Sequence, residues 1–337
     1  MSKFDRETKR NEFFAQRDKE TDALVDPKTG KVFKKLTVLV DCPLCNSKKF
    51  SVLFSKNGFD FVRCKKCSLV YVNPQLREEK MIDYYNDSSL SNDLAIQFIA
   101  SSRQQEVNRE LYSLLYDRAE KAWGKKKPVQ KRKVLDIGCS VGLFVKMGQD
   151  RGYDALGLEL NEKAAQYAEK KFKVKVERKL LHECKFPANS FDIISMFGVI
   201  EHLAEPVEVM REVARILKPG GFFVGICPNI DSLVCMTLRE KSRTFSGRIH
   251  LSYFSPKTLG ELFKKVGFKK SDIETVWTGK DSLLNYFQFL DPFGDEEYSY
   301  LPEKFCSFIL DKKKFAKIEK KMSELGIGLK LRFMARK

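Results

Sequence analysis

Residues that could do chemistry gather around a glycine-containing turn in the middle of the chain. An apolar run ends at Asp136, and Gly138 and Gly142 follow it before a helical pattern begins. Glycines in a strand-to-helix turn let a ligand approach the backbone closely. A dinucleotide-binding turn would read G-x-G-x-x-G, but Ser140 stands where its second glycine belongs. A carboxylate at this strand tip would repel a pyrophosphate, so the turn favours a cationic ligand that carries an amine.

A second acid follows the next predicted strand. Residues 152–159 form a largely apolar run that ends at Glu159, 23 positions beyond Asp136. A βαβ unit places an acid against the two hydroxyl groups of a ribose at about this spacing. Acids also cap strands in many α/β domains without binding anything. The spacing of the two acids, taken with the glycine turn, favours a nucleoside-containing ligand.

The chain has only three histidines, which are His182, His202 and His250. His202 directly follows the predicted fourth strand, at the edge where open sheets bind ligands. Glu201 beside it could orient the ring or contact a substrate. We predict that His202 and Glu201 are catalytic, with the histidine as a general base or a substrate contact. A histidine that merely caps the next helix is the alternative, and His250, in a loop on the same edge, is a second candidate.

Four cysteines form two close pairs in the first quarter of the chain. Cys42 and Cys45 are followed, after eighteen residues, by Cys64 and Cys67. The spacing C-x2-C-x18-C-x2-C is typical of a zinc ribbon, in which two tight turns present four thiolates to one ion. No histidine lies nearby, and four thiolates leave no open coordination position. We therefore predict a structural zinc ion bound by all four cysteines.

The elements that must position these residues alternate between strands and helices. Apolar runs predict strands, amphipathic spacing predicts helices, and Ser255 with Pro256 marks a helix start that Gly267 ends. Lys218–Gly221 is expected to stop a helix before the next strand. The predicted strands span 134–137, 152–159, 174–177, 189–196, 222–227, 273–277 and 329–335, and the helices among them span 143–151, 206–217 and the segment after 255.

The chain divides into four parts. We predict a loosely attached charged arm with a short hairpin over 1–40, the zinc ribbon over 41–75, a helical lid or linker over 76–132 and an α/β domain over 133–337 with an insertion at 279–328. Helices are expected at 78–85 and 94–123. Aromatic and basic residues of this part could cover a ligand, although core packing explains any one of them equally well: Tyr84, Tyr85, Phe98 and Arg103.

The net charge of +17 raises the question of a nucleic-acid partner. Its two sources are a basic cluster at 125–133 and the segment 303–337, which holds eleven basic and four acidic residues. In the second source, Phe315, Ile318, Met322 and Leu325 recur at helical spacing, so we interpret its lysines as the solvated face of a packed helix. No apolar run reaches 18 residues and charged residues are spread over the first ten positions, so we expect a cytoplasmic protein without a membrane span.

Taken together, the motifs resemble the bacterial zinc-ribbon class I S-adenosylmethionine (SAM) methyltransferases, which occur in pathways for surface glycans, modified sugars and other secondary products. The resemblance rests on the ribbon with Tyr71–Pro74, on 136–144, on Val199–Leu203 and on His250–Ser255. The catalytic half is also similar to ubiquinone-type O-methyltransferases. The resemblance implies a Rossmann-like sheet of seven strands with the last one antiparallel. It also implies that SAM contacts Asp136, Gly138, Cys139, Ser140, Gly142, Glu159 and Phe197.

Three positions depart from the pattern of these families. Ser140 replaces a glycine of the cofactor motif, which is tolerable where the backbone still turns. Arg178–Leu181 stands where an acid commonly holds the adenine amino group, so no side chain is assigned to adenine. Gly198 replaces an acid that ubiquinone-type enzymes use, with the Glu-His pair, to bind a metal. This last change argues against a catalytic divalent metal.

The resemblance implies SAM-dependent methylation, with O-methylation of a small molecule or of a glycan or sugar intermediate as the preferred function. An RNA methyltransferase that binds phosphates with the ribbon and the basic clusters is the main alternative. A binding partner with a vestigial SAM site is a third possibility. The acceptor itself and the oligomeric state are not encoded in any motif.

Overall fold

The computed structural model describes residues 8–86, 89–124, 132–277, 302–304, 307 and 311–337. The lysines at 125–127 and residues 279–301 of the predicted insertion lie outside the described residues. Within the described helices, none combines the length and the apolar character that crossing a membrane requires.

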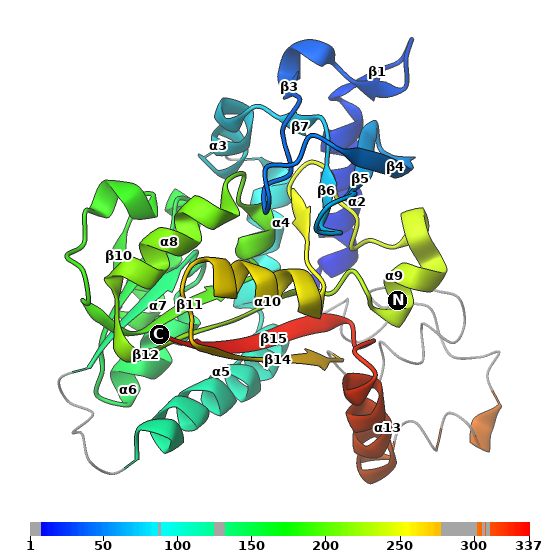
Figure 1. Ribbon diagram of the computed structural model, residues 1–337. Coiled ribbons are helices and arrows are strands. Elements are labelled where there is room, and N and C mark those ends of the chain that lie inside the picture. The colour runs from blue at the N-terminus through cyan, green and yellow to red at the C-terminus, as the bar shows by residue number, and fades with distance from the viewer. Residues whose placement is uncertain (1–7, 87–88, 125–131, 278–301, 305–306, 308–310) are drawn as a thin grey trace.

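A mixed sheet of seven strands forms the centre of the larger part of the molecule (Figure 1), in the order β10-β9-β8-β11-β12-β15-β14. The first five strands are parallel, and β15 runs antiparallel to both β12 and β14. The predicted strands and the antiparallel last strand are confirmed. The bounds are β8 (Lys133–Ile137), β9 (Asp154–Leu158), β10 (Lys175–Glu177), β11 (Phe191–Phe197), β12 (Leu217–Pro228), β14 (Lys270–Val276) and β15 (Lys330–Arg336).

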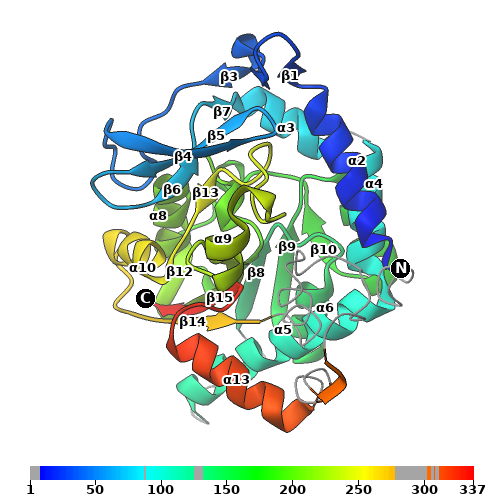
Figure 2. The ribbon, with the colours of Figure 1, turned by 90° about the vertical axis from the view of Figure 1, so that its right-hand side faces the viewer.

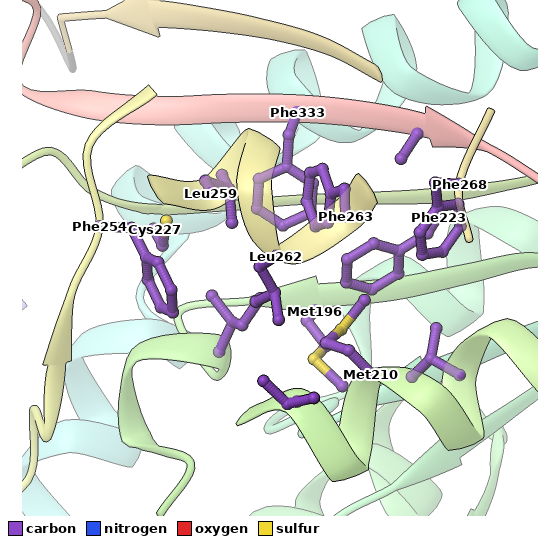
Figure 3. Packing of buried hydrophobic residues seen from close by; sticks show 14 of the residues in the cluster. Met196, Met210, Phe223, Cys227, Phe254, Leu259, Leu262, Phe263, Phe268 and Phe333 are labelled. Atoms are coloured by element: carbon purple, nitrogen blue, oxygen red, sulfur yellow. The ribbon is translucent and has the colours of Figure 1, made fainter. Parts of the chain in front are cut away.

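Helices cover both faces of this sheet (Figure 1). One buried cluster joins the sheet to α5 (Ser102–Trp123), α6 (Leu143–Asp150) and α7 (Glu162–Phe172). A second cluster joins it to α8 (Pro206–Ile216) and α10 (Pro256–Lys265). Figure 3 shows the second cluster, in which Phe263 packs against Phe223 and Phe333 and Met210 lies beside Met196. These two layers fix the strands, so the residues at their carboxyl ends share one edge.

Local sequence signals place the helix ends. The Ser255 side chain accepts a hydrogen bond from the backbone N–H of Thr258, and Pro256 occupies the first turn of α10. Gly267 follows this helix with a φ of +94°, as its predicted role as a helix stop requires. Lys218–Gly221 was expected to separate a helix from the next strand, but these residues already belong to β12, which begins at Leu217 directly after α8.

The cysteine-containing part forms a small antiparallel sheet of β4 (Phe50–Lys56), β5 (Phe59–Cys64), β6 (Val70–Val72) and β13 (Ser252–Tyr253), in the order β13-β6-β5-β4. Strand β13 comes from the α/β half of the chain. Cys42, Leu44 and Leu69 share a buried cluster with Phe254 and Leu262. The ribbon and the α/β domain therefore share one core.

The helical part before the large sheet differs from the prediction in one respect. A single helix was expected over 94–123, but α4 (Leu90–Ala100) and α5 are separate, and Ser101 between them has extended backbone. The Ser101 side chain accepts a hydrogen bond from the backbone N–H of Gln104, so it caps a new helix. The helix expected at 78–85 is confirmed as α3 (Glu78–Asn86).

The N-terminal arm is not loosely attached, and this expectation was wrong for the described residues. The predicted hairpin is present as β1 (Val25–Asp26) and β2 (Lys31–Val32). Residues before it form α2 (Arg10–Asp22), which runs alongside α4 (Figure 2) and buries Arg17 and Thr21. The Glu20 carboxylate accepts hydrogen bonds from the Ser91 backbone N–H and hydroxyl, 3.1 and 2.6 Å away, which fasten α2 to the start of α4.

The basic C-terminal segment contains α13 (Lys312–Glu324). Its Phe315, Ile318 and Met322 pack with Trp277 and Leu329, so the interpretation as one packed helix with a solvated lysine face is confirmed. Leu325, the last residue of the predicted apolar stripe, is 63% exposed because it follows the end of the helix.

Candidate functional site

The turn after β8 needs both of its glycines. Gly138 and Gly142 have φ values of +71° and +79°. A Cβ at Gly138 would lie 2.5 Å from the Val199 side chain, and one at Gly142 would lie 2.6 Å from Ala168. Ser140 also has a positive φ, +47°, so the backbone turns as it would with glycine, at a cost of about 1–2 kcal/mol.

The two predicted acids lie at the carboxyl ends of neighbouring strands. Asp136 is 2% exposed and accepts a hydrogen bond of 2.7 Å from the Ser195 hydroxyl. Burial raises the pKa of Asp136 to about 7, so a cationic ligand would strengthen its ionised form. One Glu159 oxygen accepts the backbone N–H of Ser140, and the other accepts that of Asn161, both at 2.8 Å. A carboxylate has about four acceptor sites, so roughly two remain for ligand hydroxyl groups.

Cys139 helps to hold the turn after β8 through its backbone. Its N–H donates to the carbonyl oxygen of Leu158, 2.9 Å away, and its side chain is buried. A Cβ at Gly157 would lie 2.4 Å from the Cys139 sulfur, so the thiol fills space between β8 and β9. The Cys139 side chain therefore points into the protein.

An aromatic cluster lies next to Asp136. Phe197, predicted as a cofactor residue, packs its ring 4.9 Å from that of Phe144 and 4.3 Å from that of Tyr112, between centroids. Burial raises the pKa of Tyr112, and the charges of Asp136 and Cys139 act in the same direction. Sequence reasoning missed Tyr112, because its helix pattern identifies the packed face and not the residue that reaches the strand tip.

Glu201, His202 and His250 come together after β11. The Nε2 atom of His202 lies 3.9 Å from a Glu201 oxygen, and the two imidazole rings are 4.9 Å apart between centroids. Gly198 has a φ of +67°, which favours glycine, whereas a Cβ there would make only an ordinary contact of 3.6 Å with the Glu201 carboxylate. Val199 packs next to Gly138 in the turn after β8, and it closely precedes this cluster in the chain. The turn and the cluster therefore lie at the same edge of the sheet.

The cluster has unusual protonation equilibria. Burial, with a contribution from His250, holds the pKa of His202 well below its ordinary value. Burial lowers the pKa of His250 to about 4, and its Nδ1 lies 2.9 Å from the Thr244 carbonyl oxygen, which can only accept. Burial raises the pKa of Glu201 to about 7. Both imidazoles are thus uncharged at neutral pH.

The same three side chains could also ligate a metal ion, because their ligand atoms lie within 4.8 Å of one another. Sequence reasoning missed Lys330, a half-buried residue whose pKa is lowered by desolvation and whose charge lowers the pKa of Glu201. The positive charge of Lys330 thus acts on Glu201, which is the only carboxylate of these three residues.

The four ribbon cysteines lie in one group. All four sulfur atoms are within 4.8 Å of one another, and the pairs Cys42–Cys67 and Cys45–Cys64 are 3.5 Å apart. Four thiolates around zinc at about 2.3 Å would be separated by about 3.8 Å. The donor set and its spacing fit a tetrahedral zinc ion.

The residues predicted to cover a ligand differ in burial and in their contacts. Tyr84 is buried, with the Arg248 guanidinium 4.4 Å from its ring centroid. Phe98 is half-buried in α4, and Arg103 is exposed and pairs with Glu106. The Tyr85 side chain lies outside the described residues. Core packing and surface pairing therefore explain Tyr84 and Arg103.

Comparisons with known proteins agree with this geometry. A family model described as "Methyltransferase domain" matches residues 103–272. A protein of Mycolicibacterium smegmatis named "Probable S-adenosylmethionine-dependent methyltransferase" is 28% identical over 149 residues, which are 44% of this chain and 56% of that protein. The ubiquinone biosynthesis O-methyltransferase of Idiomarina loihiensis is 31% identical over 111 residues, 30% of this chain and 45% of that protein. The chain spans about half the length of these curated relatives.

Among solved structures, the plantazolicin methyltransferase BpumL in complex with SAH matches with a TM-score of 0.50 and 14% identity, over 76% of this chain and 94% of that chain. At this identity the likeness concerns the fold alone. It agrees with the strand order of the large sheet, which is the Rossmann-like class I methyltransferase fold.

Proposed function

Because the chain belongs to the methyltransferase-domain family, we propose that it is a SAM-dependent methyltransferase that methylates a hydroxyl group of a small molecule or of a glycan or sugar intermediate. The observation that carries this proposal is the shared sheet edge. The glycine turn with Asp136 and Glu159 stands there next to an uncharged histidine with a buried carboxylate. One part suits a cationic nucleoside, and the other can remove a proton.

Each residue has a defined task in this proposal. SAM supplies a methyl group that is open to in-line displacement by an acceptor oxygen. Glu159 accepts hydrogen bonds from the ribose hydroxyls, and Asp136 faces the ammonium group. Nε2 of His202 takes the proton of the acceptor hydroxyl, and Glu201 stabilises the imidazolium that results. The match to ubiquinone O-methyltransferases supports oxygen as the acceptor atom.

Glu159→Ala should weaken SAM binding about tenfold or more, because hydrogen bonds to a carboxylate contribute about 1.5–3 kcal/mol. The variant also removes the partner of two backbone N–H groups. Glu159→Gln keeps one acceptor oxygen, so it should show an intermediate loss. Calorimetric titration with SAM measures both variants.

The matched control for Glu159 is Glu162→Ala. Glu162 is the first residue of α7, its side chain is 58% exposed, and its carboxylate pairs with Arg178. This variant removes the same charge from a position close by in the chain and should keep the wild-type affinity for SAM. Wild-type affinity in Glu159→Ala, or an equal loss in both alanine variants, would refute the ribose contact.

The acceptor class can be separated by one labelling experiment. The protein would be incubated with methyl-labelled SAM and either a lipid-glycan extract or total RNA. We expect label in the glycan extract. Label in RNA would favour the RNA methyltransferase alternative, which gains no support from the relatives described above, and binding of SAM without transfer to either would favour a vestigial site.

We further propose that the four ribbon cysteines bind one zinc ion and that the ion is structural. The spacing of the sulfur atoms and the donor set of four thiols support the proposal. Membership of the zinc-ribbon group of surface-glycan and modified-sugar methyltransferases is the finer proposal, and it rests on the ribbon together with the methyltransferase domain.

A further inference from the structure

Arg17 of α2 is a buried cation with little to neutralise it. The residue is 5% exposed, and its Nε atom is buried without a hydrogen-bond partner. Of the described acids, only Asp18 forms an ion pair with it, at 3.2 Å, and the Asp18 side chain is 48% exposed. The Phe14 and Phe13 ring centroids lie 4.9 and 5.9 Å from the guanidinium carbon. Its surroundings are therefore mainly aromatic.

Helix α2 contacts the segment before His250 near both of its ends. Asn11 accepts a hydrogen bond of 2.9 Å from Arg243, and Glu20 pairs with Arg248 at 3.2 Å. Arg17 lies between these two contacts along the helix. The positive charge of Arg17 also contributes to the lowered pKa of His250, although burial is the main cause.

Glu20, one turn further along α2, does not neutralise Arg17. Glu20 already accepts hydrogen bonds from Ser91 and pairs with Arg248. Burying a guanidinium without a matching anion is unfavourable, whereas its planar set of donors suits a carboxylate or a phosphate. A ligand that brings its own negative charge would resolve this imbalance.

We propose that Arg17 binds an anionic group of the methyl acceptor, a carboxylate or a phosphate, and thereby positions the acceptor hydroxyl beside His202. The inference rests on the proposed function, because it assigns the acceptor side of the same site. Arg17 is a specificity-determining residue in this account and takes no part in the proton transfer.

The test uses the full-length, zinc-loaded protein and two probes, inorganic phosphate and malonate, titrated by calorimetry at constant ionic strength. Arg17→Met keeps an apolar chain between the two phenylalanines but removes the charge. The matched control is Lys19→Met, which removes one charge from an exposed position of the same helix. We expect Arg17→Met to weaken binding of the preferred probe about tenfold or more, and Lys19→Met to leave it unchanged. The preferred probe distinguishes a phosphate from a carboxylate.

Thermal unfolding gives an independent readout. The preferred anion should raise the unfolding midpoint of the wild type and of Lys19→Met, but not that of Arg17→Met. If Arg17→Met does not fold, Arg17→Lys replaces it, and a weaker response to the anion than in the wild type is expected. Equal anion binding in the wild type and the Arg17 variant, or no binding to the wild type, would overturn the inference.

SAM titrations separate this inference from the proposed function. Arg17→Met should bind SAM as the wild type does, because Arg17 lies on the acceptor side. Loss of anion binding with SAM binding intact is the supporting result. A wild-type protein that does not bind SAM would refute the proposed function, whatever the anion titrations show.

Discussion

Replacing His202 by alanine should lower kcat by about 10²–10⁴, the usual contribution of a positioned general base. The affinity for SAM should stay nearly unchanged, because the proposal assigns cofactor binding to Asp136 and Glu159 and not to the imidazole. Steady-state kinetics and calorimetry on the same preparation measure the two quantities. His182→Ala is the matched control, since that side chain is exposed and lies outside the cluster of Glu201, His202 and His250.

The pH dependence gives a second readout for His202. A general base must be unprotonated, so the rate rises with pH through its pKa. Because burial holds the pKa of His202 well below its ordinary value, its limb should lie at lower pH than an exposed histidine would give. An unperturbed histidine would place this limb near neutrality. A modest loss in His202→Ala, mostly in KM and with the limb retained, would show that the residue only contacts substrate or caps the helix.

Removal of zinc should unfold more than the ribbon. Structural zinc contributes about 10–16 kcal/mol of apparent binding free energy in zinc-finger peptides, which is comparable with the whole stability of a domain. Since Cys42 and Leu44 share a core with Phe254 and Leu262, the loss should spread into the α/β half. We expect Cys67→Ser to lower the thermal unfolding midpoint strongly and to abolish stoichiometric zinc.

Metal analysis and thermal unfolding of Cys184→Ser provide the control, because this cysteine lies outside the cluster. It should keep one zinc ion per chain and a nearly unchanged midpoint. Purified wild-type protein without zinc, or a Cys67→Ser protein as stable as the wild type, would contradict the structural role of the ion.

Local patterns account for what the sequence predicts correctly. The strands of the large sheet are apolar runs, the turn between Gly138 and Gly142 needs glycine for its backbone angles, and the paired cysteines have a fixed spacing. These features depend on neighbours in the chain. The break at Ser101 is also local, but a serine inside a helical pattern does not by itself announce a cap.

Long-range packing accounts for what the sequence does not predict. Tyr112 and Lys330 reach the site from elements distant in the chain, and no motif marks either of them. His250 is placed on the right edge by its position before a helix, but its contact with His202 depends on the pairing of β13 with β6. The charged composition of α2 suggests a solvated arm, whereas the helix packs against α4 and its Arg17 is buried.

A crystal structure with S-adenosylhomocysteine tests the central claim most directly. The account predicts that the ribose hydroxyls contact Glu159 and that the ligand sulfur faces Nε2 of His202. Their separation should be roughly 6–8 Å, because a methyl group and an acceptor oxygen must fit between them. A ligand bound away from the turn at Gly138, or an imidazole directed away from the sulfur, would contradict the account.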